Sequence, residues 1–346
     1  MVWELRILAK ELQLKQINDL SILNNQQKQT MRKLFKDASF QTQFEQDGYL
    51  IIDLPNPAIL DEIDNAYQSL RPNDKFEPQN GRYHCTFIDS NLDYKRKANE
   101  LFLEYFTPFV NDFFLDYELF TGNFYVKPKN SCEFEVHQNW SVVDETKHTT
   151  LTLWIPMQDT FEYNGTIEIV PGSNKISNNI TCLFSPYYFN NFEQELKQKY
   201  FKSINLKKGQ VVIFDDNIIH YSKINKSDDP RRAMQLIAVP KEADLMIHFI
   251  DPKDSNYFNI FETNKEFYLT HDLSHFMDGT PPLKKIRRVA NTNVLLTESE
   301  FISALSNGKQ YRKELYSADN ITTTELTKKY KKKTSWLQRL NPFKGN

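Results

Sequence analysis

HTTLTLWIPM, residues 148–157, is the stretch that decides the fold class. Within LTLWIP (151–156), leucine and isoleucine alternate with threonine, tryptophan and proline, the two-residue period of a strand with two different faces. Five similar runs, separated by turn residues, are FTGNFYVKP (120–128), CEFEVHQNW (132–140), GTIEIVPGS (165–173), KGQVVIFDD (208–216) and RAMQLIAVP (232–240). Short strands at turn-punctuated spacing predict a mainly β protein with flanking helices, built as a sandwich or barrel.

The segments on either side of these strands predict the domain organisation. A strand at Tyr49–Leu54 leads into a helix, and an aromatic-rich helix follows at about 94–118. After Pro240 the pattern weakens, apart from a helix near 297–307. We predict four parts: a helical extension (1–40), the β domain (41–250), a C-terminal extension packed on it (251–320) and a basic, flexible tail (321–346).

Composition excludes several function classes. The chain has 43 Lys+Arg against 45 Asp+Glu, so it makes no strong field to attract nucleic acid, and the nine glycines form no phosphate-binding loop. Three widely spaced cysteines fit reduced thiols, and charges interrupt the apolar N-terminal residues, so we expect a cytoplasmic protein. The basic tail has the chemistry to touch an anionic membrane, but a solvated tail is the simpler interpretation.

Two of the seven histidines stand out by their surroundings. His137 lies at a strand end before polar residues, and His220 follows an apolar strand. Two neutral imidazoles on neighbouring strands, with an oxygen ligand nearby, form the three-ligand site that leaves open positions on non-haem Fe(II). Arg231, eleven residues after His220, is suited to grip a buried carboxylate bidentately. Its rival Arg232 points to the opposite face of the same strand.

An ordered set of segments carries a family resemblance. These are HQNWSVVDE (137–145), LTLWIPMQD (151–159), NGTIEIVPGSNK (164–175), GQVVIFDDNIIHYS (209–222) and PRRA (230–233). With the DGYLII opening (47–52), the set resembles the phytanoyl-CoA dioxygenase family of Fe(II)- and 2-oxoglutarate-dependent oxygenases over roughly residues 41–240. The resemblance implies a double-stranded β-helix, the cupin-like jelly roll.

The resemblance also implies roles for individual residues. His137 and His220 match the first and the distal metal ligand, and Arg231 matches the arginine that holds the 5-carboxylate of 2-oxoglutarate. Further cosubstrate contacts implied in the same way are Ser222, Trp154 and, four residues before Lys127, Asn123.

Asn139 departs from the family pattern. The family motif is His-x-Asp, whereas this chain has His-x-Asn, so the matching ligand brings no charge and metal binding should be weaker. Three interpretations of Asn139 are open. It serves as a neutral metal ligand, it is an incidental replacement in a non-catalytic binding protein, or it frees a coordination position on the metal for a halide ion. Alternatively another carboxylate fills the gap. Glu135 shares a strand face with residues 137 and 139, and Asp144 and Glu145 come next.

We therefore expect an oxygenase that uses Fe(II), O2 and 2-oxoglutarate to hydroxylate a small organic molecule, releasing succinate and CO2. The alternatives are a halogenase and a non-catalytic protein of the same fold that binds a small molecule or a partner. Substrate identity and oligomeric state do not follow from the residues, because specificity in such folds depends on the loops.

Overall fold

The structure, a computed structural model, describes residues 32–70, 83–131, 133–271 and 281–307. The predicted flexible tail, most of the N-terminal extension, and His275, which with His271 forms an HxxxH pattern, lie outside these residues. Everything below concerns the unit from Leu34 onward.

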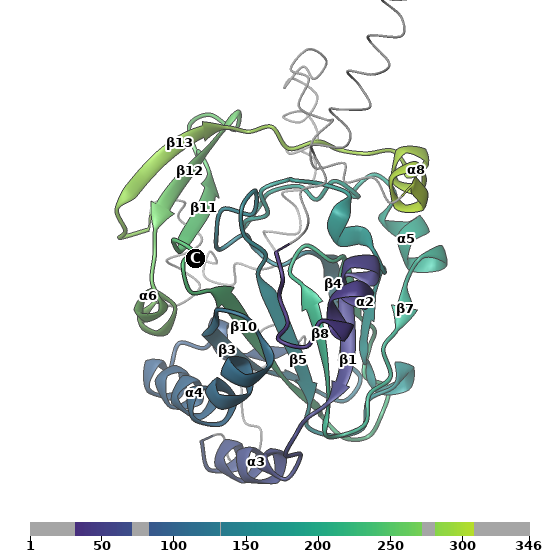
Figure 1. Cartoon of the computed structure of the whole chain (residues 1–346), viewed down its shortest axis with the longest axis vertical. Helices are drawn as coiled ribbons and strands as arrows, with labels where there is room; N and C mark the ends of the chain where they lie inside the picture. The colour runs from purple at the N-terminus through teal and green to yellow at the C-terminus, as the bar shows by residue number, and fades with distance from the viewer. Residues whose placement is uncertain (1–31, 71–82, 132, 272–280, 308–346) are drawn as a thin grey trace, which may run out of the picture. The chain divides into compact units, whose positions relative to one another are not determined.

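The largest element is a six-stranded antiparallel sheet (Figure 1). Its strands, in spatial order, are β1 (Tyr49–Asp53), β8 (Gln210–Asp215), β5 (Leu151–Pro156), β10 (Arg231–Pro240), β3 (Tyr117–Lys127) and β2 (His84–Cys85). The alternation in LTLWIP thus belongs to a central strand, and all six of its residues are buried, because both faces of the sheet are covered.

A four-stranded sheet faces the inner side of the large one. Its order is β4 (Phe134–His137), β9 (His220–Ser222), β6 (Ile167–Ile169) and β7 (Lys202–Ser203). A core of apolar side chains from both sheets fills the space between them, including Trp154 and Phe214 from the large sheet and Ile167 and Ile169 from the small one. Two facing antiparallel sheets with this core form the predicted double-stranded β-helix, or jelly roll.

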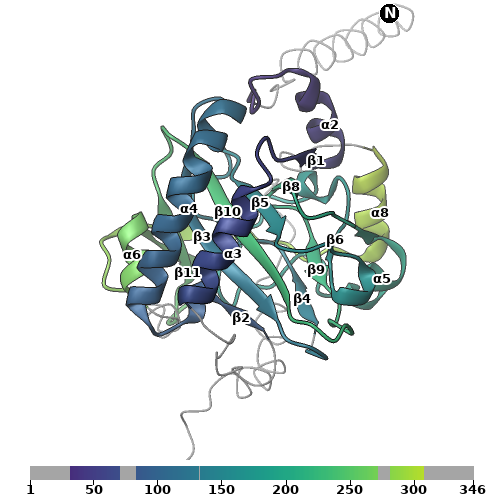
Figure 2. The same ribbon diagram turned by 90° about the horizontal axis from the view of Figure 1, so that it is seen from below.

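Helices cover the outer face of the large sheet. Figure 2 shows α3 (Ile59–Leu70) and α4 (Leu92–Phe113) lying across β3, β10 and β5. The side chains of Ala98, Phe102, Phe106 and Val110, at spacings of three or four residues, put one apolar stripe of α4 onto the sheet. Asn91 begins α4 by accepting a hydrogen bond from the backbone N–H of Tyr94.

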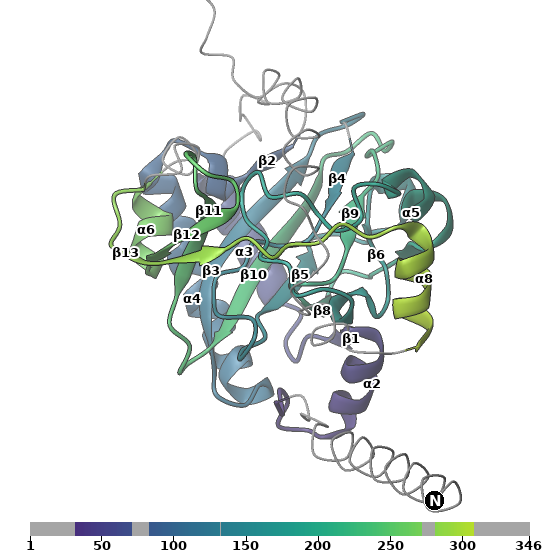
Figure 3. The same cartoon turned by 90° about the horizontal axis from the view of Figure 1, so that it is seen from above.

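The residues after β10 form a separate three-stranded sheet, and the last described residues form a helix. The remaining elements are α2 (Ser39–Asp47), α5 (Glu193–Lys199), β11 (Met246–Ile250), β12 (Tyr257–Glu262), α6 (Lys265–Thr270), β13 (Lys285–Ala290), α8 (Glu298–Asn307) and the short 3-10 turns η3 (Thr86–Ile88), η4 (Glu162–Asn164) and η5 (Ser173–Lys175). In Figure 3 the chain between β13 and α8 runs across the molecule, and its Val294 and Leu296 belong to one apolar cluster with Val136 of β4 and Tyr221 of β9. None of the described helices has the length and apolar character needed to cross a membrane.

Candidate metal and cosubstrate site

The two predicted metal-binding histidines lie side by side. His137 on β4 and His220 on β9 are directly opposite each other in the antiparallel pair. Their ring centroids are 4.1 Å apart. Phe214, from the inner face of the large sheet, packs against the His220 ring at 5.0 Å between centroids. The pair therefore faces the space between the two sheets.

Backbone hydrogen bonds fix the orientation of both rings. Nδ1 of His137 lies 2.8 Å from the carbonyl oxygen of Glu135, and Nδ1 of His220 lies 2.9 Å from that of Ile218. A carbonyl oxygen can only accept, so Nδ1 carries the hydrogen and Nε2 keeps its lone pair for a metal. Burial lowers the pKa of His137 to about 4 and that of His220 well below its usual value. Both rings are thus neutral near pH 7, the form that binds metal.

Asn139 is held firmly by its amide nitrogen. Its Nδ2 donates to Oγ1 of Thr152 at 2.8 Å and to Oδ1 of Asp216 at 2.9 Å. These two bonds use both amide hydrogens, so Oδ1 is left as the acceptor atom. The only hydrogen bond to Oδ1 within the described residues is a long one of 3.5 Å from Nε2 of Gln235. Asn139 thus offers an amide oxygen, which is a suitable, uncharged metal ligand.

Other carboxylates do not join the histidines. Glu135 is exposed on β4, and in the described ranges no three His, Cys, Asp or Glu side chains gather as a metal site. Asp144 accepts hydrogen bonds from Thr146, and Glu145 accepts one from Ser141. The donors that the structure supports are therefore two imidazoles and one amide oxygen, a nitrogen and oxygen set that fits Fe(II) without adding charge.

Arg231 is buried without a counter-ion in the described part of the chain. Its side chain begins β10 at 4% exposure, and its Nε and Nη1 have no hydrogen-bond partner there. The guanidinium lies over the Trp154 ring, 5.4 Å from its centroid. Burial lowers the pKa of Arg231 to about 10, which leaves the group charged at neutral pH. A buried cation with unused donors is costly on its own, so this geometry suits a bound carboxylate.

Arg232 points the other way, as strand parity predicts. Its Nη2 forms an ion pair with Oδ1 of Asp64 on α3 at 3.2 Å, and its guanidinium lies over the ring of Tyr67 on the same helix. Arg232 therefore faces the helical layer outside the large sheet. Only Arg231 faces the inner side where the histidines lie.

Lys127, which the sequence analysis did not single out, orients Ser222. Lys127 pairs with Arg231 across β3 and β10 and is 1% exposed. Its Nζ donates to Oγ of Ser222 at 2.7 Å, to the Ser222 carbonyl at 2.8 Å and to the Lys223 carbonyl. Because an ammonium only donates, the Ser222 hydroxyl accepts here and its own hydrogen stays available to a ligand. The signal available in the sequence was a lysine as the last residue of a strand whose other residues are mostly buried.

The remaining predicted contacts lie in one row across the large sheet. Gln235 on β10 is directly opposite Asn123 on β3 and Trp154 on β5. Directly opposite residues point to the same face, so all three share the inner face with Arg231. The structure thus gathers His137, His220, Asn139, Arg231, Ser222, Trp154 and Asn123 on the inner faces of the jelly roll or at its adjoining loop.

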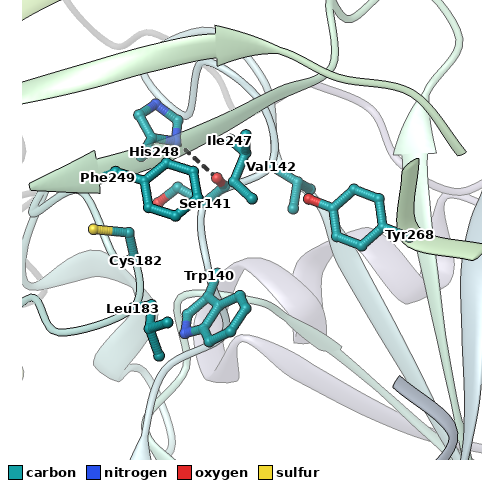
Figure 4. A pocket seen from close by; sticks show the side chains of 9 residues that line it. All are labelled: Trp140, Ser141, Val142, Cys182, Leu183, Ile247, His248, Phe249 and Tyr268. Atoms are coloured by element: carbon teal, nitrogen blue, oxygen red, sulfur yellow. Dashed lines mark hydrogen bonds between the residues drawn. The ribbon is translucent and has the colours of Figure 1, made fainter. Parts of the chain in front are cut away.

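A small separate pocket lies beyond Asn139 (Figure 4). Its walls come from the segment after β4, from residues 182–183, from β11 and from α6, and its lining side chains are Trp140, Ser141, Val142, Cys182, Leu183, Ile247, His248, Phe249 and Tyr268. Neither histidine of the pair contributes to it. It is therefore a gap at the junction with the C-terminal sheet and not the space in front of the proposed metal.

Comparisons with known proteins identify relatives of this chain. The chain is 25% identical over 202 residues to a phytanoyl-CoA dioxygenase domain-containing protein 1 homolog of Dictyostelium discoideum, covering 55% of this chain and 62% of the relative. It is 29% identical over 120 residues to a phytanoyl-CoA dioxygenase of Arabidopsis thaliana, covering 34% and 42%. The matches thus span less than two thirds of each relative.

Solved structures with related folds include a non-haem alpha-ketoglutarate-dependent carbocyclase, SnoK, from nogalamycin biosynthesis. It has a TM-score of 0.48 and 16% identity, over 60% of this chain and 86% of that one. EctD from S. alaskensis, crystallised with 2-oxoglutarate and 5-hydroxyectoine, has a TM-score of 0.44 and 20% identity, over 60% and 78%.

The family model provides the assignment. The model of phytanoyl-CoA dioxygenase matches residues 44–233, more than half of the chain, and this range contains every residue of the candidate site. Fe(II), 2-oxoglutarate and O2 are the metal, the cosubstrate and the oxidant of this family. The chain therefore belongs to the phytanoyl-CoA dioxygenase family of 2-oxoglutarate-dependent oxygenases, the family that its motifs resemble.

Proposed function

We propose that this protein hydroxylates a small organic molecule, with conversion of 2-oxoglutarate to succinate and CO2. The observation that carries the proposal is Arg231, whose buried guanidinium has unused donors on the same inner surface as the two histidines. A structural arginine at that depth would ordinarily be paired with a carboxylate. The free carboxylate end of 2-oxoglutarate supplies that partner.

Each residue has a distinct task in this proposal. His137 and His220, through Nε2, and Asn139, through Oδ1, would hold Fe(II). When bound, the metal and cosubstrate supply the oxygen chemistry. Arg231 and the hydroxyl of Ser222 hold the far carboxylate, and Trp154 packs beside the guanidinium and excludes water from it. Lys127 donates to the Ser222 hydroxyl oxygen, which leaves the hydroxyl hydrogen to donate to that carboxylate.

Release of succinate tests the proposal without knowledge of the substrate. Purified protein with Fe(II), O2 and 2-oxoglutarate should form succinate slowly in the absence of substrate. Replacing His137 or His220 by Ala should abolish both succinate formation and stoichiometric iron uptake, since one imidazole and one amide hold Fe(II) poorly. The variant Lys284→Ala, which changes an exposed ion pair with Glu262, is the matched control and should behave as the wild type.

Two results of this experiment would contradict the proposed hydroxylation. Binding of Fe(II) and 2-oxoglutarate without any succinate would favour a non-catalytic binding protein, and iron uptake unchanged in both histidine variants would reject the site itself. Halogenation requires a coordination position open to halide. The Asn139 amide, anchored to Thr152 and Asp216 beside the histidines, gives no support to such a gap. The cytoplasmic location and a small-molecule substrate as the partner stay predictions.

A further inference from the structure

We propose that Asp216 supplies the negative charge that the metal ligands of this chain lack, and that it acts through Asn139 by orienting the amide oxygen toward the metal. Asp216 is in this view a positioning residue. The inference rests on the proposed metal site and concerns the charge and the geometry of that site.

The hydrogen bonds around Asp216 determine which end of the amide faces it. Oδ1 of Asp216 accepts from Nδ2 of Asn139 at 2.9 Å and from Oγ1 of Thr152 at 2.5 Å. An ionised carboxylate only accepts, so it selects the nitrogen end of the amide and turns the oxygen end away. Thr152 accepts from the same nitrogen at 2.8 Å, which closes the network and prevents the amide from flipping.

The charge of Asp216 has no cation to balance it in the described residues. Its side chain is 1% exposed, forms no ion pair there, and receives its hydrogen bonds from neutral groups. Its second oxygen, Oδ2, has no hydrogen-bond partner within the described residues. Burial raises the pKa of Asp216 to about 6, while the neighbouring Thr152, Asn139 and Thr150 side chains lower it. A buried carboxylate in such surroundings is costly, and a divalent cation bound beside Asn139 would offset that cost.

The carboxylate also improves Asn139 as a ligand. A hydrogen bond from the amide nitrogen to a carboxylate shifts electron density toward the amide oxygen, as outer partners do for metal-bound imidazoles. The Asp216 carboxylate thus supplies the single negative charge that an aspartate ligand would bring. It does so from behind Asn139 and not in direct contact with the metal.

A structural role alone makes a different prediction. The loop that carries Asp216 is already tied by its backbone, because the N–H of Asn139 donates to the Asp216 carbonyl and the N–H of Asp216 donates to the Thr150 carbonyl. If the side chain only stabilised this loop, its removal would lower stability without changing metal affinity in the protein that still folds.

The experiment is anaerobic titration of the full chain with Fe(II), and with Co(II) as a spectroscopic substitute, by calorimetry and visible absorption. The variants are D216N, the double exchange N139D/D216N, and the control D215N. Asp215 is equally buried but bonds to Asn174 and to the Asn217 N–H, outside the network. Thermal unfolding of each metal-free variant shows whether it is folded.

We expect D216N to bind metal about 10- to 100-fold more weakly, the size of effect that outer partners of metal ligands have. The double exchange keeps one amide and one carboxylate facing each other and returns the charge to the ligand, so it should bind at least as tightly as the wild type. D215N should change the affinity much less than D216N.

Three results would overturn the inference. One is unchanged affinity in folded D216N, and another is a double variant that binds no better than D216N. If D216N does not fold, the metal affinity of the double variant decides the question alone, because this variant keeps the buried hydrogen bond between residues 139 and 216. Metal binding by the double variant but not by the wild type would show that Asp216 does not replace a carboxylate ligand. Absence of binding in all variants would instead reject the proposed function together with this inference.

Discussion

At the scale of single residues, the two adjacent arginines give the sharpest prediction. Replacing Arg231 by Lys keeps the charge but loses the planar fork, so 2-oxoglutarate should bind at least about tenfold more weakly, the loss of one charged hydrogen bond. Arg232→Lys is the matched control. It alters a partly exposed ion pair with Asp64 and should leave the affinity within about twofold. Calorimetric titration with 2-oxoglutarate measures both, and a loss confined to the Arg232 variant would reverse the assignment.

Residues of the candidate site differed in how visible they were in the sequence. His137, His220 and Arg231 were predictable because each lies in a recognisable motif at a fixed place along its strand. Asp216 and Lys127 were not, because their importance depends on contacts with residues 77 and 95 positions away. Asp216 follows another aspartate at a strand end, where such a pair is typical of an ordinary turn.

At the scale of elements, Gly122 controls how α4 packs on the large sheet. A Cβ at this position of β3 would lie 2.5 Å from Phe102 on α4 and 2.7 Å from Leu236 on β10. Gly122→Ala should therefore lower the free energy of unfolding by about 1–3 kcal/mol, the usual cost of overpacking, and urea denaturation measures it. The control Gly172→Ala meets no atom closer than 3.6 Å but has a φ of +77°, so its cost comes from backbone strain alone. A Gly122 variant as stable as the wild type would contradict the close packing.

The same scale shows where sequence patterns succeed. The six quoted runs contain β4, β5, β6 and β8 whole and most of β3 and β10, because alternation and turn residues mark these strands clearly. β9 has three residues, too few to show a period, although it carries His220. β13 (Lys285–Ala290) is mostly exposed and rich in basic residues, so it lacks the apolar alternation that identifies a half-buried strand. Pairing with β12 determines its conformation.

At the scale of the whole described unit, the C-terminal sheet and the jelly roll share one apolar core. Phe249 on β11 and Phe261 on β12 pack with Phe120 on β3, and Val142 and Val143 from the segment after β4 join them. Val142 lies three residues after Asn139, so the C-terminal sheet supports the loop that carries the proposed ligand. Among the polar contacts at this junction is that of His248 on β11, whose Nδ1 lies 2.8 Å from the Ser141 carbonyl (Figure 4).

His248 should make this junction sensitive to acid. Burial lowers the pKa of His248 to about 4, and Arg287 lowers it further while the hydrogen bond to Ser141 and the charge of Asp144 raise it. The unfolded chain binds this proton near pH 6.5, so the unfolded state takes up more protons than the folded one between pH 6.5 and 4. The contribution of His248 to stability is therefore complete above pH 6.5 and decreases as the pH falls to about 4, by about 3 kcal/mol at most.

The variant His248→Asn separates this effect from all other titrations. Its amide nitrogen takes the place of Nδ1 and can still donate to the Ser141 carbonyl, but it does not bind a proton in this range. His137 and His220 are present in both proteins, so their titration cancels in the difference. The free energy of unfolding of the wild type, measured by urea denaturation at intervals from pH 7.5 to 4, should fall more steeply than that of the variant. Parallel curves would show that His248 is not buried in its neutral form, and the close contact between the C-terminal sheet and the loop after Asn139 would then be wrong.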